Sequence, residues 1–389
     1  MIRSAKIRVF ADESAIVSRE ITAPTDRYER FRGRRAAWYG GMESVVLELF
    51  SDTAKGFAIT QGGMATAAVL QRHLLPLLAC ADIDGPGDVR AWWQTLRDCT
   101  YTYGTGGIAS MARSVIDLAL WDMVGHRQGL PVYGLLGGRP RPVPAYANGG
   151  DIDANRSAGY VGSKVNLTAG PWHRAGLDEA RRQIADARLR AGSDHLLMID
   201  AWMGLTPEFA GQLAPAIVDA QIHWLEEPLP PDAWRDLPRL RAVLGEVRLA
   251  AGEHTYDADS LRRLVEHGVD VLQPDIAWFG GLTPLIDGAR DICADNGGRP
   301  VTFAPHLGGT AWGVHAAMLI PSVSMLECYL EPVRPDTAGP VRGGPKPVDG
   351  HLTATDRPGF GVLPNDDVID SRTVWAATID LTTGSGGQA

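Results

Sequence analysis

Eight short apolar runs recur along the chain from residue 143 onward, separated by polar residues and amphipathic stretches. The runs cover residues 143–148, 161–167, 195–199, 222–225, 247–251, 269–273, 300–304 and 323–326. Apolar runs of this length alternating with helical patterns are typical of parallel strands connected by helices. Eight such units in succession predict a parallel barrel, in which all strands end at one face and the active site lies at that face.

The helices between these runs have recognisable start signals. Thr206 precedes Pro207 and Thr283 precedes Pro284, so each threonine is placed to cap a helix that begins with proline. Asp257 is placed to cap a helix over 259–267. These signals support the strand and helix alternation.

The pattern before the barrel is different. Residues 2–10 predict a strand, and 44–50 with 56–60 predict a hairpin that turns at 51–53. Helical periodicity then covers 66–80, 89–99 and 108–126. We therefore expect an α+β domain at 1–128, a barrel at 129–342, and a C-terminal segment at 343–389. Its strand-like stretch 374–381 is expected to return to the first domain, and the glycine-rich tail 383–387 to be disordered.

Composition and charge limit the classes of partner. The chain has 389 residues and a net charge of −9, which argues against nucleic acid and against an anionic membrane surface as partners. No run of 18 apolar residues exists, so no membrane span is expected. The four cysteines form no CxxC pair, and the N-terminus lacks the apolar core of a signal peptide. A cytoplasmic location is the simplest interpretation.

Three acidic residues follow three consecutive runs at matched spacing. Asp200, Glu226 and Glu253 are 26 and 27 residues apart, the length of one strand, one helix and two loops. A single acid after a strand usually caps a helix or lies at the surface, but three at this spacing would converge at one barrel face. A bound cation would offset their repulsion, and ligation by oxygen alone favours Mg²⁺.

The next strands carry a candidate base. Asp275 follows the sixth run and His306 the seventh, so the two side chains are expected to meet. A carboxylate on one imidazole nitrogen fixes the tautomer and leaves the other nitrogen to accept a proton. Taken alone, His306 favours a structural role over a catalytic one, but its place opposite three acids favours the catalytic interpretation. Glu327 on the eighth strand would donate to a developing oxyanion if it were protonated.

Two further features have ordinary explanations. Residues 104–109 match the G-x-G-x-x-A dinucleotide pattern but lack a preceding strand, which favours a glycine-rich start of a helix. Residues 28–41 are basic and aromatic without periodicity, which predicts a loop, and a solvated surface loop is its ordinary interpretation.

Longer stretches resemble the enolase superfamily, in its mandelate racemase-like branch. They are residues 117–138, 224–228 and 252–254, and the resemblance extends over nearly the whole chain. It implies an α/β fold in which an α+β capping domain covers a modified TIM barrel of the (β/α)7β type, with one Mg²⁺ and a homo-oligomeric assembly. The implied metal ligands are Asp200, Glu226 and Glu253, with Glu227 as a neighbour.

Within that branch, residues 162–164, 199–203, 252–254 and 273–283 are most similar to L-rhamnonate dehydratases. The resemblance implies Mg²⁺-dependent dehydration of a sugar acid to a 2-keto-3-deoxy acid. It also implies roles for His306 as the base, Lys164 on the carboxylate side, and three substrate contacts: Arg35 (with Arg34 as the second choice), His254 and Trp202. The sequence departs from these enzymes at 25–41 and 307–313, so the identity of the sugar stays open.

Two other functions fit part of the pattern. A non-catalytic sugar-acid binder is disfavoured by the complete set of three acids. A racemase or epimerase on the same scaffold needs a base on each face of C2, and in this branch one base comes from a Lys-x-Lys motif. Here the motif is replaced by Lys164 and Asn166, and an amide cannot accept a proton from carbon. The sequence therefore predicts chemistry on one face, with His306 as the base.

Overall fold

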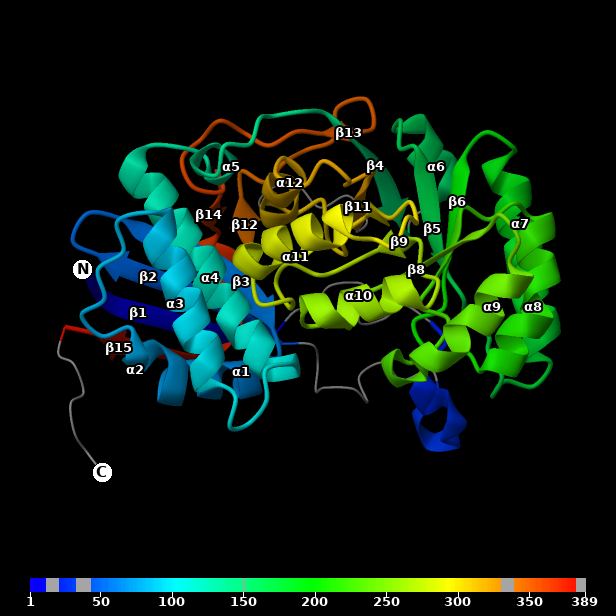
Figure 1. Ribbon diagram of the computed structural model, residues 1–389, viewed down its shortest axis with the longest axis horizontal. Helices are drawn as coiled ribbons and strands as arrows, with labels where there is room; N and C mark the ends of the chain where they lie inside the picture. The colour runs from blue at the N-terminus through cyan, green and yellow to red at the C-terminus, as the bar shows by residue number, and fades with distance from the viewer. Residues whose placement is uncertain (12–20, 33–42, 150, 330–338, 383–389) are drawn as a thin grey trace.

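The computed structural model describes residues 1–11, 21–32, 43–149, 151–329 and 339–382. It has two parts that lie side by side in Figure 1: a sheet with helices formed mainly by the N-terminal third, and a barrel formed by the remainder. Arg35 and Arg34, most of the predicted loop 28–41, and the tail 383–387 lie outside the described residues.

The N-terminal sheet is antiparallel and has the order β15-β1-β2-β3. Its strands are β1 (Ile2–Phe10), β2 (Ser44–Ser51), β3 (Lys55–Gln61) and β15 (Thr373–Asp380). The predicted first strand and hairpin are confirmed. The strand-like C-terminal stretch lies beside the N-terminus, since β15 pairs with β1 from Ser4 to Phe10 (Figure 1).

Helices cover one face of this sheet. They are α1 (Gly63–Val69), a π-helical turn (Leu70–Leu74), α2 (Leu75–Leu77), α3 (Pro86–Cys99) and α4 (Gly107–Gln128). Helix α4 is buried over most of its length because it lies between the sheet and the barrel. It crosses β3 at Gly56, where a Cβ atom would come within 1.9 Å of the Ala119 carbonyl oxygen, so only glycine permits this approach.

Eight parallel strands form the barrel, and their order is β10-β9-β8-β7-β6-β5-β4-β11. They are β4 (Val143–Asn148), β5 (Gly162–Asn166), β6 (Leu196–Asp200), β7 (Trp224–Glu226), β8 (Arg248–Ala251), β9 (Val271–Leu272), β10 (Thr302–Phe303) and β11 (Leu326–Tyr329). The two ends of this sheet meet where the Phe303 N–H donates to Ser322 O and the Ser324 N–H donates to Phe303 O, both at 2.9 Å. The predicted barrel is confirmed.

Each of the first seven barrel strands is followed by a helix before the next strand. These helices are α6 (Ile152–Ser157), α7 (Gly176–Ala191), α8 (Pro207–Asp219), α9 (Leu237–Val243), α10 (Ala258–Glu266), α11 (Leu282–Ala294) and α12 (Ala311–Ala317). The arrangement is (β/α)7β, as the resemblance implied. Helix α5 (Val132–Leu135) connects α4 to the barrel, and 3-10 turns cover Pro24–Arg27, Glu29–Phe31 and Pro231–Asp236.

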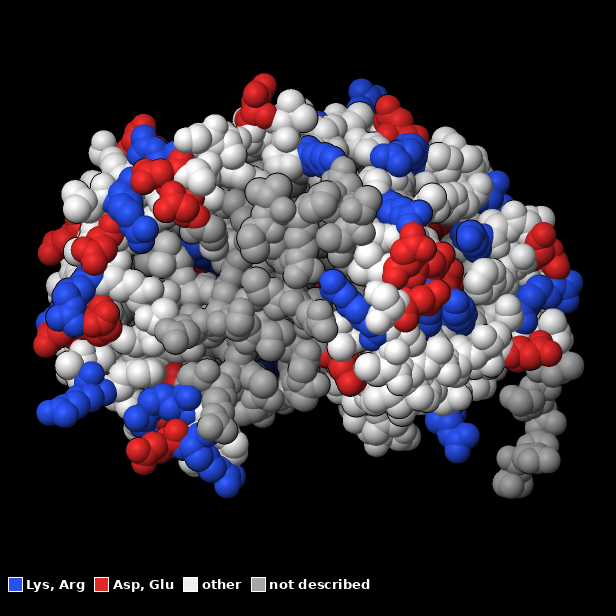
Figure 2. All heavy atoms as spheres, turned by 180° about the vertical axis from the view of Figure 1, so that it is seen from behind, with Lys and Arg blue, Asp and Glu red and all other residues white. Residues whose placement is uncertain are grey.

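The C-terminal segment runs back from the barrel to the first sheet through β12 (Val341–Arg342), β13 (His351–Leu352), β14 (Leu363–Pro364) and α13 (Asp366–Arg372). Strand β13 pairs with β4. The proposed domain bounds at 128 and 342 stay a prediction. None of the described helices is both long enough and apolar enough to cross a membrane. On the face in Figure 2, described acidic and basic side chains are interspersed.

Two of the three predicted helix caps are confirmed. Thr206 accepts from the Phe209 N–H, and Asp257 accepts from the Ser260 N–H. The prediction for Thr283 is wrong: α11 begins two residues earlier than expected, at Leu282 after Gly281, and the Thr283 hydroxyl instead donates to Asp117 at 2.6 Å. A Cβ atom at Gly281 would lie 2.3 Å from the Asp117 carboxylate, so the contact with α4 determines this helix start.

Asp122 provides a test of how α4 holds the parts together. Its buried carboxylate accepts from the Phe57 N–H at 3.0 Å and the Phe360 N–H at 2.9 Å. Asp122→Ala leaves both donors unpaired, and we expect it to lower the free energy of unfolding by about 2–4 kcal/mol in denaturant titrations. The exposed helical Asp186→Ala is the control and should change it by less than about 0.5 kcal/mol. Equal effects of the two variants would contradict this role.

Candidate active site

The three predicted metal ligands lie together at the carboxyl ends of the barrel strands. Asp200 is the last residue of β6 and Glu226 the last of β7, and the two are paired in register. Glu253 lies two residues beyond β8. All three are buried. The alternation along each strand directs these side chains inward, so adjacent strand ends bring like charges together.

Lys164 lies among these carboxylates. It projects from β5 and is 1% exposed. Its Nζ atom lies 3.5 Å from Asp200 Oδ2 and 2.6 Å from Glu327 Oε1, and it also contacts Glu226 Oε1. Burial lowers the pKa of Lys164, but the surrounding carboxylates outweigh burial and raise it well above its ordinary value. Lys164 is therefore a buried ammonium bound by three acids.

Further donors fix the acids in place. Glu226 Oε2 accepts from Trp224 Nε1 at 2.9 Å and from Gln273 Nε2 at 2.7 Å. Asp200 Oδ1 accepts from the Trp202 N–H at 2.9 Å. Burial raises the pKa of Asp200 to about 6 and that of Glu226 to about 8, although Lys164 lowers both. The cluster thus gathers more negative charge than Lys164 alone balances.

The structure brings His306 and Asp275 together. Strands β9 and β10 end at Leu272 and Phe303, so both residues lie in loops three residues beyond the strands rather than at their ends. His306 Nδ1 is 2.7 Å from Asp275 Oδ2, and Nε2 is 3.5 Å from Glu253 Oε2. Burial lowers the pKa of His306, but Glu253 and Asp275 outweigh it and raise the pKa well above its ordinary value.

Glu327 is held as an ionised carboxylate. It accepts from the Leu307 N–H at 3.0 Å and from Asn148 Nδ2 at 2.8 Å, in addition to its ion pair with Lys164. Burial raises the pKa of Glu327, but Lys164 and His306 outweigh burial and hold it below its ordinary value. These contacts favour the ionised form of Glu327, which cannot donate to a developing oxyanion as a protonated Glu327 would.

Trp202 and His254, two of the predicted substrate contacts, bond to acidic side chains of the protein. Trp202 Nε1 donates to Glu253 Oε1 at 3.0 Å. His254 Nδ1 lies 2.7 Å from Glu227 Oε2 and 3.4 Å from Glu253 Oε1. Burial lowers the pKa of His254, but Glu227 and Glu253 raise it to about 9. Both side chains therefore contact Glu253, and His254 also contacts Glu227.

Glu227, Glu253 and His254 form an alternative candidate metal site. Within the described ranges, one ligand atom each of Glu227, Glu253 and His254 lies within 4.8 Å of the others. This set differs from the predicted one. His254 Nδ1 bonds to Glu227, so this nitrogen is a donor and offers no lone pair to a metal. We therefore favour Asp200, Glu226 and Glu253, which are acceptors only once they are ionised and which lie at the ends of successive strands.

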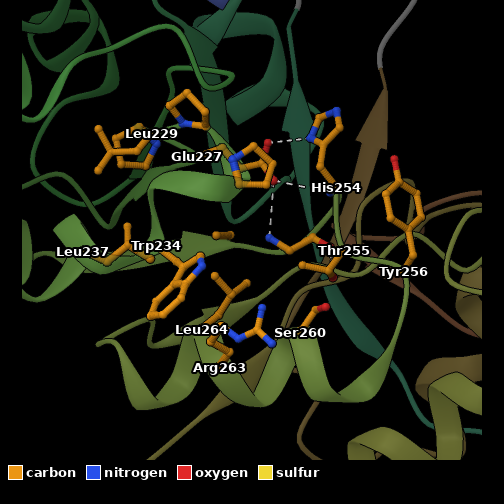
Figure 3. A pocket seen from close by; sticks show the side chains of 15 residues that line it. Glu227, Leu229, Trp234, Leu237, His254, Thr255, Tyr256, Ser260, Arg263 and Leu264 are labelled. Carbon is orange, nitrogen blue, oxygen red and sulfur yellow. Dashed lines mark hydrogen bonds and ion pairs between the residues drawn. The ribbon is translucent and has the colours of Figure 1, made fainter. Parts of the chain in front are cut away.

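A cavity of about 110 Å³ lies behind the Glu227–His254 pair. Figure 3 shows this pair along one side, with Trp234, Leu237 and Leu264 on the other. Asp200, Glu226 and His306 do not line it. The other residues that line it are mainly apolar. Because the residues of the charged centre are absent from its walls, we treat this cavity as separate from that centre.

Sequence reasoning missed several residues of the site: Glu227 as the partner of His254, Gln273, Trp278 and Tyr329. The Trp278 ring lies between His254 and His306, with centroids 5.7 and 5.4 Å away. Gln273 falls within a predicted strand, and Tyr329 follows Glu327 by two residues, so the period of a strand was the available signal for both.

Comparison with known proteins places both parts of the chain. The mandelate racemase / muconate lactonizing enzyme N-terminal domain family matches residues 44–137, and the enolase C-terminal domain-like family matches residues 152–368. A putative L-rhamnonate dehydratase from Caldivirga maquilingensis is 36% identical over 361 residues, which cover 90% of this chain and 88% of that protein.

Two solved structures are similar over almost the whole chain. Rhamnonate dehydratase from Gibberella zeae, complexed with Mg, is 27% identical with a TM-score of 0.86 and covers 96% of each chain. A racemase from Streptomyces coelicolor with bound magnesium is 25% identical with a TM-score of 0.77, and the match covers 96% of this chain and 100% of that one.

The balance of buried charge at Lys164 is open to test. Lys164→Met keeps most of the side-chain volume but leaves Asp200, Glu226 and Glu327 without their cation. Removing one partner of a buried ion pair costs about 3–5 kcal/mol, and we expect a loss of this size in the free energy of unfolding at neutral pH. The exposed Lys55→Met is the matched control and should be near neutral. A Lys164→Met protein as stable as the wild type would refute the ion-pair account.

Proposed function

Because the chain belongs to the enolase superfamily, in its mandelate racemase and muconate lactonizing enzyme branch, we propose that it is a hydro-lyase that dehydrates a sugar acid to a 2-keto-3-deoxy acid. The relatives named as rhamnonate dehydratases support an aldonate resembling L-rhamnonate as substrate. The observation that carries the proposal is the His306–Asp275 pair, which faces three buried carboxylates.

The donor set fits a divalent cation that prefers oxygen. Asp200, Glu226 and Glu253 are buried and supply carboxylate oxygens, and the acids near them outnumber Lys164. Such donors suit Mg²⁺, which also keeps positions for water and substrate oxygens. When bound, Mg²⁺ supplies positive charge beside the substrate carboxylate and so stabilises the enediolate. The Mg-complexed dehydratase and the Mg-bound racemase support this choice of metal.

His306 acts as the base in this proposal. The Nδ1–H of His306 donates a hydrogen bond to Asp275, which also accepts from the Ala277 N–H at 2.7 Å, so the imidazole is held with Nε2 as the proton acceptor. Nε2 takes the proton from C2 of the substrate. Lys164 lies on the opposite side of the acids and offers positive charge to the substrate carboxylate. Loss of the C3 hydroxyl as water then gives an enol, which tautomerises to the keto acid.

A racemase on the same scaffold is the second candidate, and Asn166 argues against it. Lys164 and Asn166 are alternate residues of β5, so both face the barrel interior. The Asn166 amide cannot take a proton from carbon, and the Lys164 ammonium is bound by Glu327, Glu226 and Asp200. The base is therefore supplied from the His306 side. An aldonate that resembles L-rhamnonate as the substrate, and a homo-oligomeric assembly, stay predictions.

Metal dependence is the first test of this function. Chelation of the wild-type protein should abolish formation of keto acid from the substrate, and Mg²⁺ should restore it. Glu253→Gln removes one ligand charge and should require far more Mg²⁺ for any turnover. Glu246→Gln, at an exposed position, should behave as wild type. Full activity of metal-free Glu253→Gln would overturn the ligand assignment.

The second test concerns the base. His306→Asn keeps the size of the side chain but accepts no proton, so both C2 exchange and dehydration should fall by about 100-fold or more. Circular dichroism and Mg²⁺ affinity should be unchanged, and His351→Asn in the C-terminal segment is the control. Wild-type enzyme in D₂O should form keto acid and leave the remaining substrate without its C2 epimer. Appearance of the epimer would favour the racemase.

A further inference from the structure

Tyr329 lies inside the barrel, beside the proposed base. It is two residues after Glu327 on β11, so both side chains point inward, whereas Cys328 between them contacts Tyr160 on the other side of the strand. Its aromatic ring stands perpendicular to the His306 ring, with centroids 5.8 Å apart. The mechanism proposed above assigns no role to Tyr329.

The Tyr329 hydroxyl contacts the reactive nitrogen of His306. The hydroxyl oxygen is 2.9 Å from Nε2, while Nδ1 is occupied by Asp275 at 2.7 Å. Nε2 is the atom that takes the C2 proton in the proposed reaction. Tyr329 is therefore placed at the point to which the proton is delivered.

A phenol hydroxyl suits both protonation states of this histidine, because it is a donor and an acceptor. In the neutral form that a base requires, His306 accepts a hydrogen bond from the Tyr329 O–H at Nε2, and the C2 hydrogen of the substrate takes the place of that bond when the proton is transferred. After proton transfer, the Nε2–H donates to the Tyr329 oxygen, and the phenol O–H is released to point elsewhere. The hydrogen bond is thus re-formed with its direction reversed, and the phenol proton becomes available to a neighbouring acceptor.

We propose that Tyr329 relays the proton from His306 to the C3 hydroxyl as that group departs. This inference rests on the proposed dehydratase function. The Nε2–H bond breaks as a new Tyr329 O–H bond forms, and the original phenol proton passes to the C3 oxygen. The C3–O bond breaks with its electron pair, water leaves, and the electrons of the enediolate form the C2–C3 double bond. His306 and Tyr329 both end in the state in which they began.

The relay separates two events of the reaction. C2 proton exchange needs His306 alone, whereas dehydration needs both His306 and Tyr329, whose hydroxyl lies 2.9 Å from Nε2.

Tyr329→Phe tests the relay because it removes only the hydroxyl. In D₂O with Mg²⁺ and the sugar acid that the wild type dehydrates, this variant should keep C2 exchange within severalfold of wild type. Dehydration should fall by about 100-fold, the scale of a lost proton donor. Tyr160→Phe, which removes a phenol on the other side of the same strand, should leave both rates unchanged. A parallel fall of exchange and dehydration would show that Tyr329 only orients His306, and unchanged dehydration would show no role; either overturns the relay.

A substrate analogue with fluorine in place of the C3 hydroxyl provides the rescue experiment. Fluoride leaves as an anion and needs no proton from the enzyme. Tyr329→Phe should therefore eliminate fluoride within severalfold of the wild-type rate, and the same 100-fold deficit on this analogue would refute the relay. If the wild type itself forms no keto acid from any sugar acid, both the dehydratase function and the relay are refuted. If the wild type dehydrates a sugar acid, the rates of Tyr329→Phe test the relay alone.

Discussion

The ion pairs of Lys164 with the surrounding carboxylates are the interaction on which the charged centre depends. Taking a charged group out of water costs several kcal/mol, and here the barrel buries Asp200, Glu226 and Glu327 around one ammonium. Such clusters are poor sources of stability, because apolar side chains would fill the same space at lower cost. Their presence at the carboxyl ends of the strands is best explained by the chemistry that they support.

The capping domain positions the loop that orients the base. The Thr60 hydroxyl donates to Ala277 O at 2.7 Å, the Gly280 N–H donates to Ser114 Oγ at 2.8 Å, and Trp93 Nε1 donates to Gly280 O at 2.8 Å. All three contacts hold the segment that begins at Asp275. The N-terminal domain therefore helps to hold the loop that carries Asp275, the carboxylate bonded to His306.

Much of this arrangement could be predicted from local patterns. Strand period and helix caps located the barrel units, and the spacing of Asp200, Glu226 and Glu253 follows from one strand-helix unit between consecutive acids. Contacts between distant parts of the chain left no local signal. The start of α11 at Leu282 depends on Asp117, 165 residues earlier, and the link from Tyr329 to His306 depends on the closure of the barrel. Tyr329 lies beyond the predicted eighth run, and although the strand period relates it to Glu327, no local pattern indicates that its hydroxyl contacts His306.

The central claim is that His306 and the buried acids perform a dehydration on one face of a sugar acid. A panel of aldonic and aldaric acids, incubated with the protein and Mg²⁺ and analysed for 2-keto acids and for C2 epimers, tests it most directly. The account predicts that at least one aldonic acid loses water to give a 2-keto-3-deoxy acid, without epimerisation of the remaining substrate. Formation of C2 epimers with no keto acid across the panel would contradict it.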